Sequence, residues 1–158
     1  MVRAVKQFIE EQRTPEVLVC SSLSIESPLY AYIRAELNEP STTINAVTPT
    51  QILEQQRRYP LSVMLGCFEQ CPRNDTQVYL GHLKNVLSES VFCIVDAKNS
   101  EWRHSDFLAM GMKRDQHFDL LGETYDLYAY HLTTYQRKKD WNSPKNWANP
   151  ENWGKYRW

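Results

Sequence analysis

The sequence predicts an α/β fold of three layers, built on an open sheet that is mostly parallel and ends in an antiparallel hairpin. Two apolar runs, residues 61–68 and 91–97, lack the alternation of a half-exposed strand. Such runs are typical of parallel strands that are covered on both faces. Between them, apolar residues recur at helical spacing, namely Tyr79, Leu80, Leu83, Val86 and Leu87. Strand, helix and strand together indicate a right-handed βαβ unit, from which open α/β sheets are built.

The segment before this unit begins with a predicted helix and a predicted strand. Residues 2–13 carry an apolar stripe at helical spacing. This helix ends at Thr14–Pro15, because proline disfavours helical geometry in the residue before it. The apolar run 17–20 predicts the first strand of the sheet. Ser27 followed by Pro28 then predicts the start of a second helix, whose apolar stripe consists of Leu29, Ile33 and Leu37.

Residues 42–47 are rich in β-branched side chains and predict a second strand. Thr48 followed by Pro49 repeats the pattern of a cap and a proline, and predicts a helix that extends to about residue 58. The chain therefore enters the central βαβ unit after two strands and three helices.

The segment after residue 97 predicts a short helix and a ribbon. Ser105 is the expected cap of the helix and Gly111 its end. Residues 112–134 form two extended segments that we expect to join near Gly122–Glu123. The alternation of the second segment places Tyr128 and Tyr130 on one side and Leu127 and Ala129 on the other, which suits an antiparallel hairpin.

The composition is that of a soluble globular protein, with 42% hydrophobic and 23% charged residues among 158. No apolar run approaches the roughly 20 residues that span a membrane, and the N-terminus has no signal-peptide core. The four cysteines show no zinc-binding spacing, and no HxH or HExxH pattern occurs. We therefore expect a reduced, cytoplasmic protein without a metal site or a membrane partner.

The last part of the chain differs from the rest. Residues 135–158 hold six basic side chains against two acidic ones, and contain the repeat WNSPKN, WANPEN, WGKYRW. Each repeat begins with a tryptophan, at positions 141, 147 and 153. We expect an α/β domain over residues 1–134 and a basic tail over 135–158 that packs on it, because exposed tryptophans favour aggregation. The alternative is a tail that binds single-stranded nucleic acid, through phosphate contacts and stacking on bases.

The segment CFEQCPRNDTQVYLGHLKNVLSESVFCIVDA resembles the fourth strand, the following helix and the fifth strand of class I S-adenosylmethionine-dependent methyltransferases. The short helix that ends at Gly111 and the ribbon after it match the last helix and the last two strands of that family. The resemblance implies a Rossmann-like fold over nearly the whole chain. The ending WANPENWGKYRW is similar to that of a small uncharacterised bacterial protein family.

The chain departs from the methyltransferase pattern at three places. The turn after the first strand, residues 21–26, contains no glycine, although the family uses a glycine-rich turn to approach the cofactor. The second strand ends Ala46–Val47–Thr48, without the carboxylate that holds the ribose in the family. Too few residues separate Thr48 from Leu61 for a third strand and a full helix. We therefore expect a methyltransferase-like fold with one strand missing and no functional cofactor site.

Candidate functional residues lie where the parallel strands end, because open α/β sheets bind ligands there. The candidate crevice is formed by Ser21, Ser22, Glu69 and Asp96. The two carboxylates could serve as a general base or bind a polar ligand, and the serines could bind a phosphate at a helix start. The alternative for all four is to cap loops and helix starts. Cys71 could be a nucleophile, but no histidine partner is evident, which favours an inert thiol.

These features predict a binding or assembly module without a bound cofactor. Its expected partner is another protein. One alternative is a divergent S-adenosylmethionine-dependent methyltransferase that holds its cofactor with the serine turn and Glu69 or Asp96. The other is nucleic-acid binding through the tail, which the near-neutral charge of the whole chain disfavours.

Overall fold

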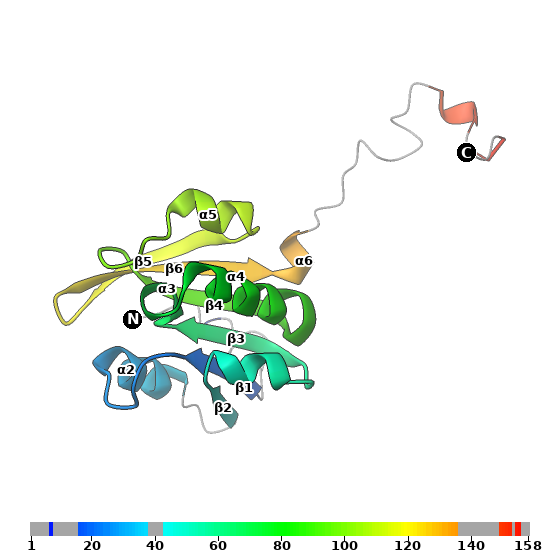
Figure 1. The fold of residues 1–158 in the computed structure, drawn as a ribbon. Helices are drawn as coiled ribbons and strands as arrows, with labels where there is room; N and C mark the ends of the chain where they lie inside the picture. Colours follow the sequence, from blue (N-terminus) through cyan, green and yellow to red (C-terminus); the bar gives the residue numbers. More distant parts are fainter. Residues whose placement is uncertain (1–6, 8–15, 38–42, 136–148, 153, 156–158) are drawn as a thin grey trace.

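The computed structural model describes residues 7, 16–37, 43–135, 149–152, 154 and 155. Its centre is a six-stranded sheet in the order β2-β1-β3-β4-β6-β5 (Figure 1). Strands β1 to β4 run parallel, whereas β6 is antiparallel to both β4 and β5. The strands are β1 Glu16–Ser21, β2 Thr43–Val47, β3 Tyr59–Leu65, β4 Ser88–Asp96, β5 Lys113–Leu120 and β6 Glu123–His131. The predicted fold class is confirmed.

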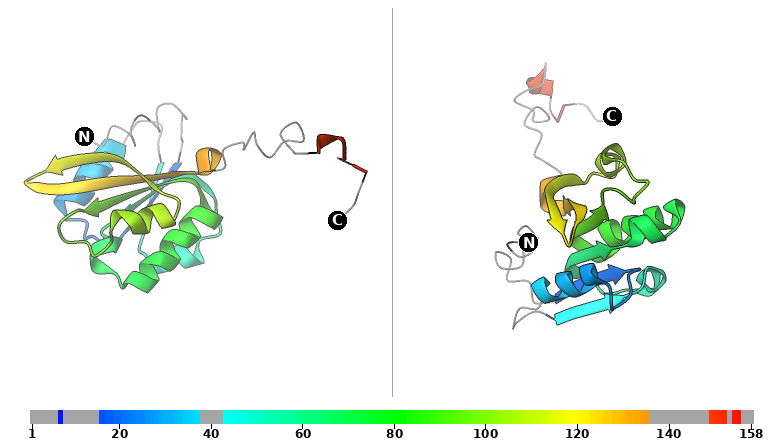
Figure 2. Two further views of the ribbon diagram at one scale, coloured as in Figure 1. Left: turned by 90° about the horizontal axis from the view of Figure 1, so that it is seen from above. Right: turned by 90° about the vertical axis from the view of Figure 1, so that its left-hand side faces the viewer.

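Helices cover both faces of the sheet (Figure 2). Helix α2 lies on one face, and the short 3-10 helix η1, α3, α4 and α5 lie on the other. Helix α4 continues directly into a π-helical turn, η2, before β4 begins. The helices are α2 Pro28–Leu37, η1 Thr50–Glu54, α3 Cys67–Gln70, α4 Arg73–His82, η2 Leu83–Leu87, α5 His104–Ala109, α6 Leu132–Tyr135 and η5 Pro150–Asn152.

The central strands are buried on both faces, as their apolar runs predict. In β1, Leu18 and Cys20 pack toward α4, whereas Val17 and Val19 pack toward α2. In the hairpin, Tyr128 and Tyr130 face the α4 side, and Leu127 and Ala129 face the α2 side. The faces predicted for these four hairpin residues are therefore confirmed.

Two predicted elements are shorter than expected. The helix predicted over residues 48–58 is only the single turn η1, because β3 begins at Tyr59 and Gln55 is already extended. The strand predicted over 61–68 ends at Leu65, because Gly66 has a left-handed φ of 70° and starts α3. No strand lies between Val47 and Tyr59, so the predicted absence of one strand is confirmed.

The ends of two further elements also differ from the prediction. Helix α5 begins at His104 rather than after Ser105, and the Asp106 carboxylate accepts the backbone N–H of Arg103 at 2.8 Å. The side chain that caps the helix is therefore an aspartate inside its first turn. The hairpin turn lies at Leu121–Gly122, one residue before the predicted position. Both residues have positive φ, as a two-residue type I′ turn requires.

The predicted N-terminal helix, apart from Gln7, and the tryptophans at positions 141, 147 and 153 lie outside the described residues. The packing of the tail on the domain and its nucleic-acid binding therefore stay predictions. The described part of the tail contains η5, in which the Asn152 N–H donates to the Asn149 carbonyl at 3.2 Å. Among the described residues, no helix is long and apolar enough to cross a membrane.

Candidate functional site

The loops that follow β1 and β3 leave the sheet toward opposite faces. Strand β1 leads into α2 on one face, and β3 leads into α3 and α4 on the other, although the two strands are neighbours in the sheet. Open α/β proteins bind ligands in the crevice at such a point, beyond the carboxyl ends of the strands. The predicted residue Ser21 ends β1 and Ser22 follows it, so both lie at this point, which is the candidate functional site.

The turn after β1 is packed against the end of β3. The Ser22 N–H donates to the Leu65 carbonyl at 3.1 Å, so the ladder between β1 and β3 continues past Ser21. The Ser21 hydroxyl accepts the Leu23 N–H at 3.0 Å. The Leu23 side chain then lies over Gly66, where an added Cβ would stand 2.5 Å from Leu23 Cδ2. The Leu23 side chain therefore occupies the space over Gly66, between the two strand ends.

Thiols lie beneath this turn. Cys20 Sγ is 4.0 Å from Cys67 Sγ, and both are buried. The Ser22 hydroxyl is buried next to the Cys67 and Cys71 thiols. Thiols are weak hydrogen-bond partners, and the hydroxyl makes no stronger hydrogen bond within the described residues. A hydrogen bond with Cys20, together with burial, raises the pKa of Cys67 well above its usual value. Burial and the neighbouring Cys67 raise the pKa of Cys71 to about 11. At neutral pH the Cys67 and Cys71 thiols are therefore protonated, which favours the inert role for Cys71.

The Glu69 side chain lies on α3 rather than at the end of β3, where we expected it, and reaches the Asp96 backbone at the end of β4. Glu69 Oε1 accepts the Asp96 N–H at 2.7 Å. Burial raises the pKa of Glu69 to about 7, and the hydrogen bond from Asp96 opposes the rise only in part. Glu69 therefore changes its protonation state near neutral pH, as a general base does.

Asp96 has a different role from Glu69. Its carboxylate accepts the N–H groups of Lys98 at 2.9 Å and Asn99 at 3.1 Å, and the Asn99 side-chain amide at 2.7 Å. Burial acts to raise the pKa of Asp96, but these hydrogen bonds outweigh it and hold the pKa below its usual value. The Asp96 carboxylate thus caps the loop after β4, which matches the alternative that the sequence left open.

An aromatic cluster holds the loops around these carboxylates. Phe107 is fully buried and stacks on Tyr128 with ring centroids 3.8 Å apart. It also contacts Phe68 of α3 and Trp102 of the loop after β4, at 5.1 Å and 5.6 Å. The Arg73 guanidinium lies 4.5 Å from the Trp102 ring. Because Glu69 follows Phe68 directly, this cluster positions α3 and its carboxylate.

The structure thus brings Glu69 and Asp96 together and keeps both serines in the turn after β1. Sequence reasoning missed Leu23, whose side chain lies over Gly66. The one sequence signal for this contact was the glycine directly after a buried strand, because such a glycine often marks a close approach of another segment to the backbone.

The histidines are distributed over separate elements of the described structure. His117 Nδ1 lies 2.7 Å from Asp126 Oδ1 on the hairpin, and His131 Nδ1 lies 3.0 Å from the Ser90 hydroxyl on the sheet. In the part of the chain that the structure describes, no three His, Cys, Asp or Glu residues form a group that could hold a metal ion.

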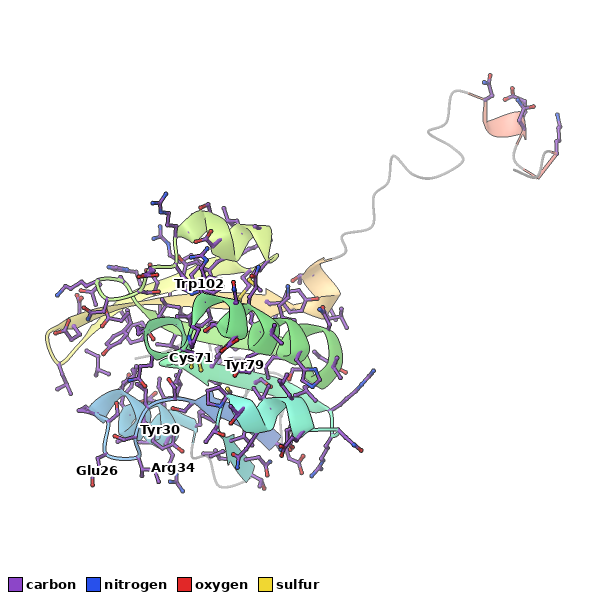
Figure 3. All side chains as sticks on the ribbon, in the orientation of Figure 1. Glu26, Tyr30, Arg34, Cys71, Tyr79 and Trp102 are labelled. Atoms are coloured by element: carbon purple, nitrogen blue, oxygen red, sulfur yellow. The ribbon has the colours of Figure 1, made fainter. Side chains whose placement is uncertain are left out.

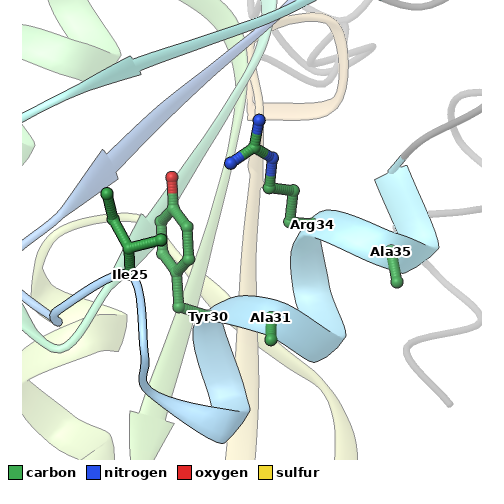
Figure 4. Close-up of a pocket in the computed structure, with 5 residues that line it drawn as sticks. All are labelled: Ile25, Tyr30, Ala31, Arg34 and Ala35. Carbon is green, nitrogen blue, oxygen red and sulfur yellow. The ribbon is translucent and has the colours of Figure 1, made fainter.

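A surface pocket of about 440 Å³ lies on α2 and the loop before it (Figure 4). Its lining residues are Ile25, Tyr30, Ala31, Arg34 and Ala35. The Tyr30 hydroxyl and the Arg34 guanidinium point in the same direction, beside Ile25. No sequence signal indicated this pocket, because it forms from four residues of α2 and one exposed loop residue.

The geometry of the thiols predicts their reactivity. We expect Cys71, labelled in Figure 3, to react first with a thiol reagent, and Cys20 and Cys93 to react slowly because they are buried. The thiolate is the reacting form, so the rate at Cys71 should rise about tenfold per pH unit from pH 7 toward its pKa of about 11. Peptide mass spectrometry of the labelled native protein measures each position. A Cys71→Ser variant should lack the first phase, and fast labelling of Cys20 or Cys93 would contradict the burial.

One protein family matches nearly the whole chain. The model of a family described as "Family of unknown function (DUF6231)" matches residues 2–158. A search of the curated proteins finds no match. The family match extends through the tail, where the sequence resembled an uncharacterised family.

Similar solved structures are S-adenosylmethionine-dependent methyltransferases. The methyltransferase domain of bacterial CtHen1-C is 10% identical, with 82% of this chain and 95% of that chain covered and a TM-score of 0.52. Magnesium protoporphyrin IX methyltransferase (ChlM) from Synechocystis PCC 6803 with bound SAM is 10% identical, with coverages of 81% and 76% and a TM-score of 0.50. Its structure with bound SAH is 8% identical, with coverages of 81% and 80% and a TM-score of 0.51. At these identities the likeness establishes the methyltransferase-like fold alone.

Proposed function

The chain belongs to DUF6231, a family of unknown function, and we propose that it is a binding or assembly module built on a methyltransferase-like fold, without a functional S-adenosylmethionine site. The observation that supports the proposal is the closed crevice between β1 and β3. The Ser22 N–H pairs with the Leu65 carbonyl, and Leu23 covers Gly66. A cofactor at this point would need the space that the Leu23 side chain occupies.

The other residues at the strand ends also fit the cofactor poorly. Thr48 follows β2 and carries no carboxylate, and its N–H is bonded to the Gln51 side chain at 2.9 Å. The Asp96 carboxylate accepts three hydrogen bonds from its own loop. The residues present therefore do not fit S-adenosylmethionine.

Calorimetric titration tests the proposal directly. We expect S-adenosylmethionine to bind with a dissociation constant above about 1 mM, which corresponds to less than about 4 kcal/mol of net binding. The control is Leu23→Ala, which opens space over Gly66 but supplies no carboxylate, and should bind equally weakly. Micromolar binding by the wild-type protein would contradict the proposal.

The second candidate function is a divergent methyltransferase, and one observation favours it. The pKa of Glu69 on α3 is about 7, and its carboxylate contacts the Asp96 backbone at the end of β4, where a general base would act on a bound substrate. If micromolar binding were observed, loss of that binding in Glu69→Gln and Asp96→Asn would locate the cofactor at this pair and support the second candidate.

A further inference from the structure

Two polar groups in the pocket on α2 have no partner within the described residues. The Tyr30 hydroxyl and the Arg34 guanidinium point in the same direction beside Ile25 (Figure 4). Neither group makes a hydrogen bond or an ion pair in the part of the chain that the structure describes. Other arginines of the described structure are each paired with a carboxylate, namely Arg57, Arg73 and Arg114.

Tyr30 is the more informative of the two residues, because packing fixes its ring. The ring belongs to the core cluster on the α2 face of the sheet, and only 6% of the residue is exposed. Its hydroxyl is nevertheless aimed into the pocket (Figure 4). The hydroxyl of a buried tyrosine usually has a hydrogen-bond partner. A fixed hydroxyl without a described protein partner therefore points to a ligand atom that accepts its hydrogen bond.

The other lining residues leave room for an apolar group. Ala31 and Ala35 are exposed on α2, and their small side chains leave the pocket open. Ile25, in the loop before the helix, is 74% exposed. The volume of about 440 Å³ lies within the range of about 300–1,000 Å³ that is typical of small-molecule pockets. The pocket thus combines one cation, one hydroxyl and apolar surface.

A single cation beside a neutral donor suits a ligand with a single negative charge. The guanidinium of Arg34 can bind both oxygens of a carboxylate through two parallel N–H groups. The Tyr30 hydroxyl can donate to the same carboxylate. A phosphate monoester carries about −1.5 to −2 charges at neutral pH, and the described lining residues include no second cation to balance it. The composition of the pocket therefore favours a carboxylate.

We propose that this pocket binds a small aliphatic carboxylate. The carboxylate group contacts Arg34 and Tyr30, and the aliphatic chain lies against Ile25 and the two alanines of α2. None of the four residues of the candidate crevice lines this pocket. The inference therefore does not rest on whether the protein binds S-adenosylmethionine, and titrations with the two ligands have separate outcomes.

Calorimetric titration of the full chain with octanoate tests the site. We expect a dissociation constant below about 1 mM. 1-Octanol has the same chain without the charge, and should give no binding heat at about 1 mM because it cannot pair with Arg34. Octyl phosphate should bind more weakly than octanoate, since its second negative charge has no cation to pair with.

Substitutions in the pocket should weaken octanoate binding while the protein stays folded. Arg34→Ala should raise the dissociation constant at least about tenfold, and Arg34→Lys should restore only part of the affinity, because lysine lacks the planar fork. Tyr30→Phe keeps the buried ring, removes only the hydroxyl and should raise the dissociation constant about tenfold. Ala31→Leu fills the pocket from an exposed helical position and should weaken binding to a similar extent.

A matched control separates the pocket from general effects of charge. Arg58→Ala removes the same charge from an exposed position between η1 and β3, and should leave the dissociation constant unchanged. Circular dichroism checks that each variant is folded. A wild-type protein that binds no octanoate up to about 10 mM overturns the proposal. So does octanoate binding that neither Arg34→Ala nor Tyr30→Phe weakens, or tighter binding of octyl phosphate than of octanoate.

Discussion

Gly66→Ala is expected to lower the free energy of unfolding by about 3 kcal/mol. The left-handed φ of 70° at Gly66 contributes about 1 kcal/mol or more, because an L-residue is strained there. The added Cβ would also stand 2.5 Å from Leu23 and 2.8 Å from the Ser22 hydroxyl, and such overpacking costs about 1–3 kcal/mol. Urea denaturation of the variant and the wild type measures the difference.

A matched glycine separates the two causes. Gly122 has a similar positive φ of 87°, but no atom lies within 4 Å of an added Cβ. Gly122→Ala should therefore cost only the backbone strain, about 1 kcal/mol. Leu23→Ala combined with Gly66→Ala should recover part of the loss. If Gly66→Ala is no more destabilising than Gly122→Ala, the turn after β1 does not close over Gly66.

Phe107→Ala is expected to lower the free energy of unfolding by about 3–5 kcal/mol, since the ring is fully buried and its removal leaves a cavity. The cavity would lie among Phe68, Trp102 and Tyr128, which connect α3, the loop after β4 and β6. Because Glu69 is the next residue after Phe68, the loss should also loosen the carboxylate at the candidate site. Denaturation measures the stability, and the fluorescence of Trp102 should shift to longer wavelength as water enters.

The neighbouring residue provides the control. Leu108 lies on the same helix but is exposed, and Leu108→Ala should change the stability by less than about 0.5 kcal/mol. A loss below about 1 kcal/mol for Phe107→Ala would mean that the cluster does not hold α5 and α3 together.

The order and type of the strands were predictable because the number of buried faces of a strand determines its pattern of apolar residues. The uninterrupted apolar runs of β3 and β4 and the alternation of β6 each indicate how many faces of the strand are covered. The missing strand was also predictable, because Thr48 and Tyr59 are too close in sequence for a strand and a helix. Chain length alone sets that limit.

The element ends were less predictable because they depend on single backbone conformations. Residues 61–68 form one apolar run, yet the left-handed φ of Gly66 divides it into β3 and α3. The first turn of α5 likewise depends on the Asp106 carboxylate reaching back to the Arg103 N–H, which competes with the predicted cap at Ser105. Apolar patterning does not distinguish such alternatives.

By itself, the sequence determined the fold class, the absent strand and the position of Ser21 and Asp96 at the strand ends. These properties follow from periodicity, chain length and the rule that parallel strands end at one edge. Only the tertiary structure decided what that edge contains. Leu23 lies against Gly66, 43 residues away in sequence, and the Glu69 carboxylate accepts the Asp96 backbone N–H. Each contact joins a side chain to the backbone of a distant segment. Both contacts depend on the path of loops whose local sequence allows several conformations. Packing against the neighbouring strands selects the loop conformation in which Leu23 covers Gly66.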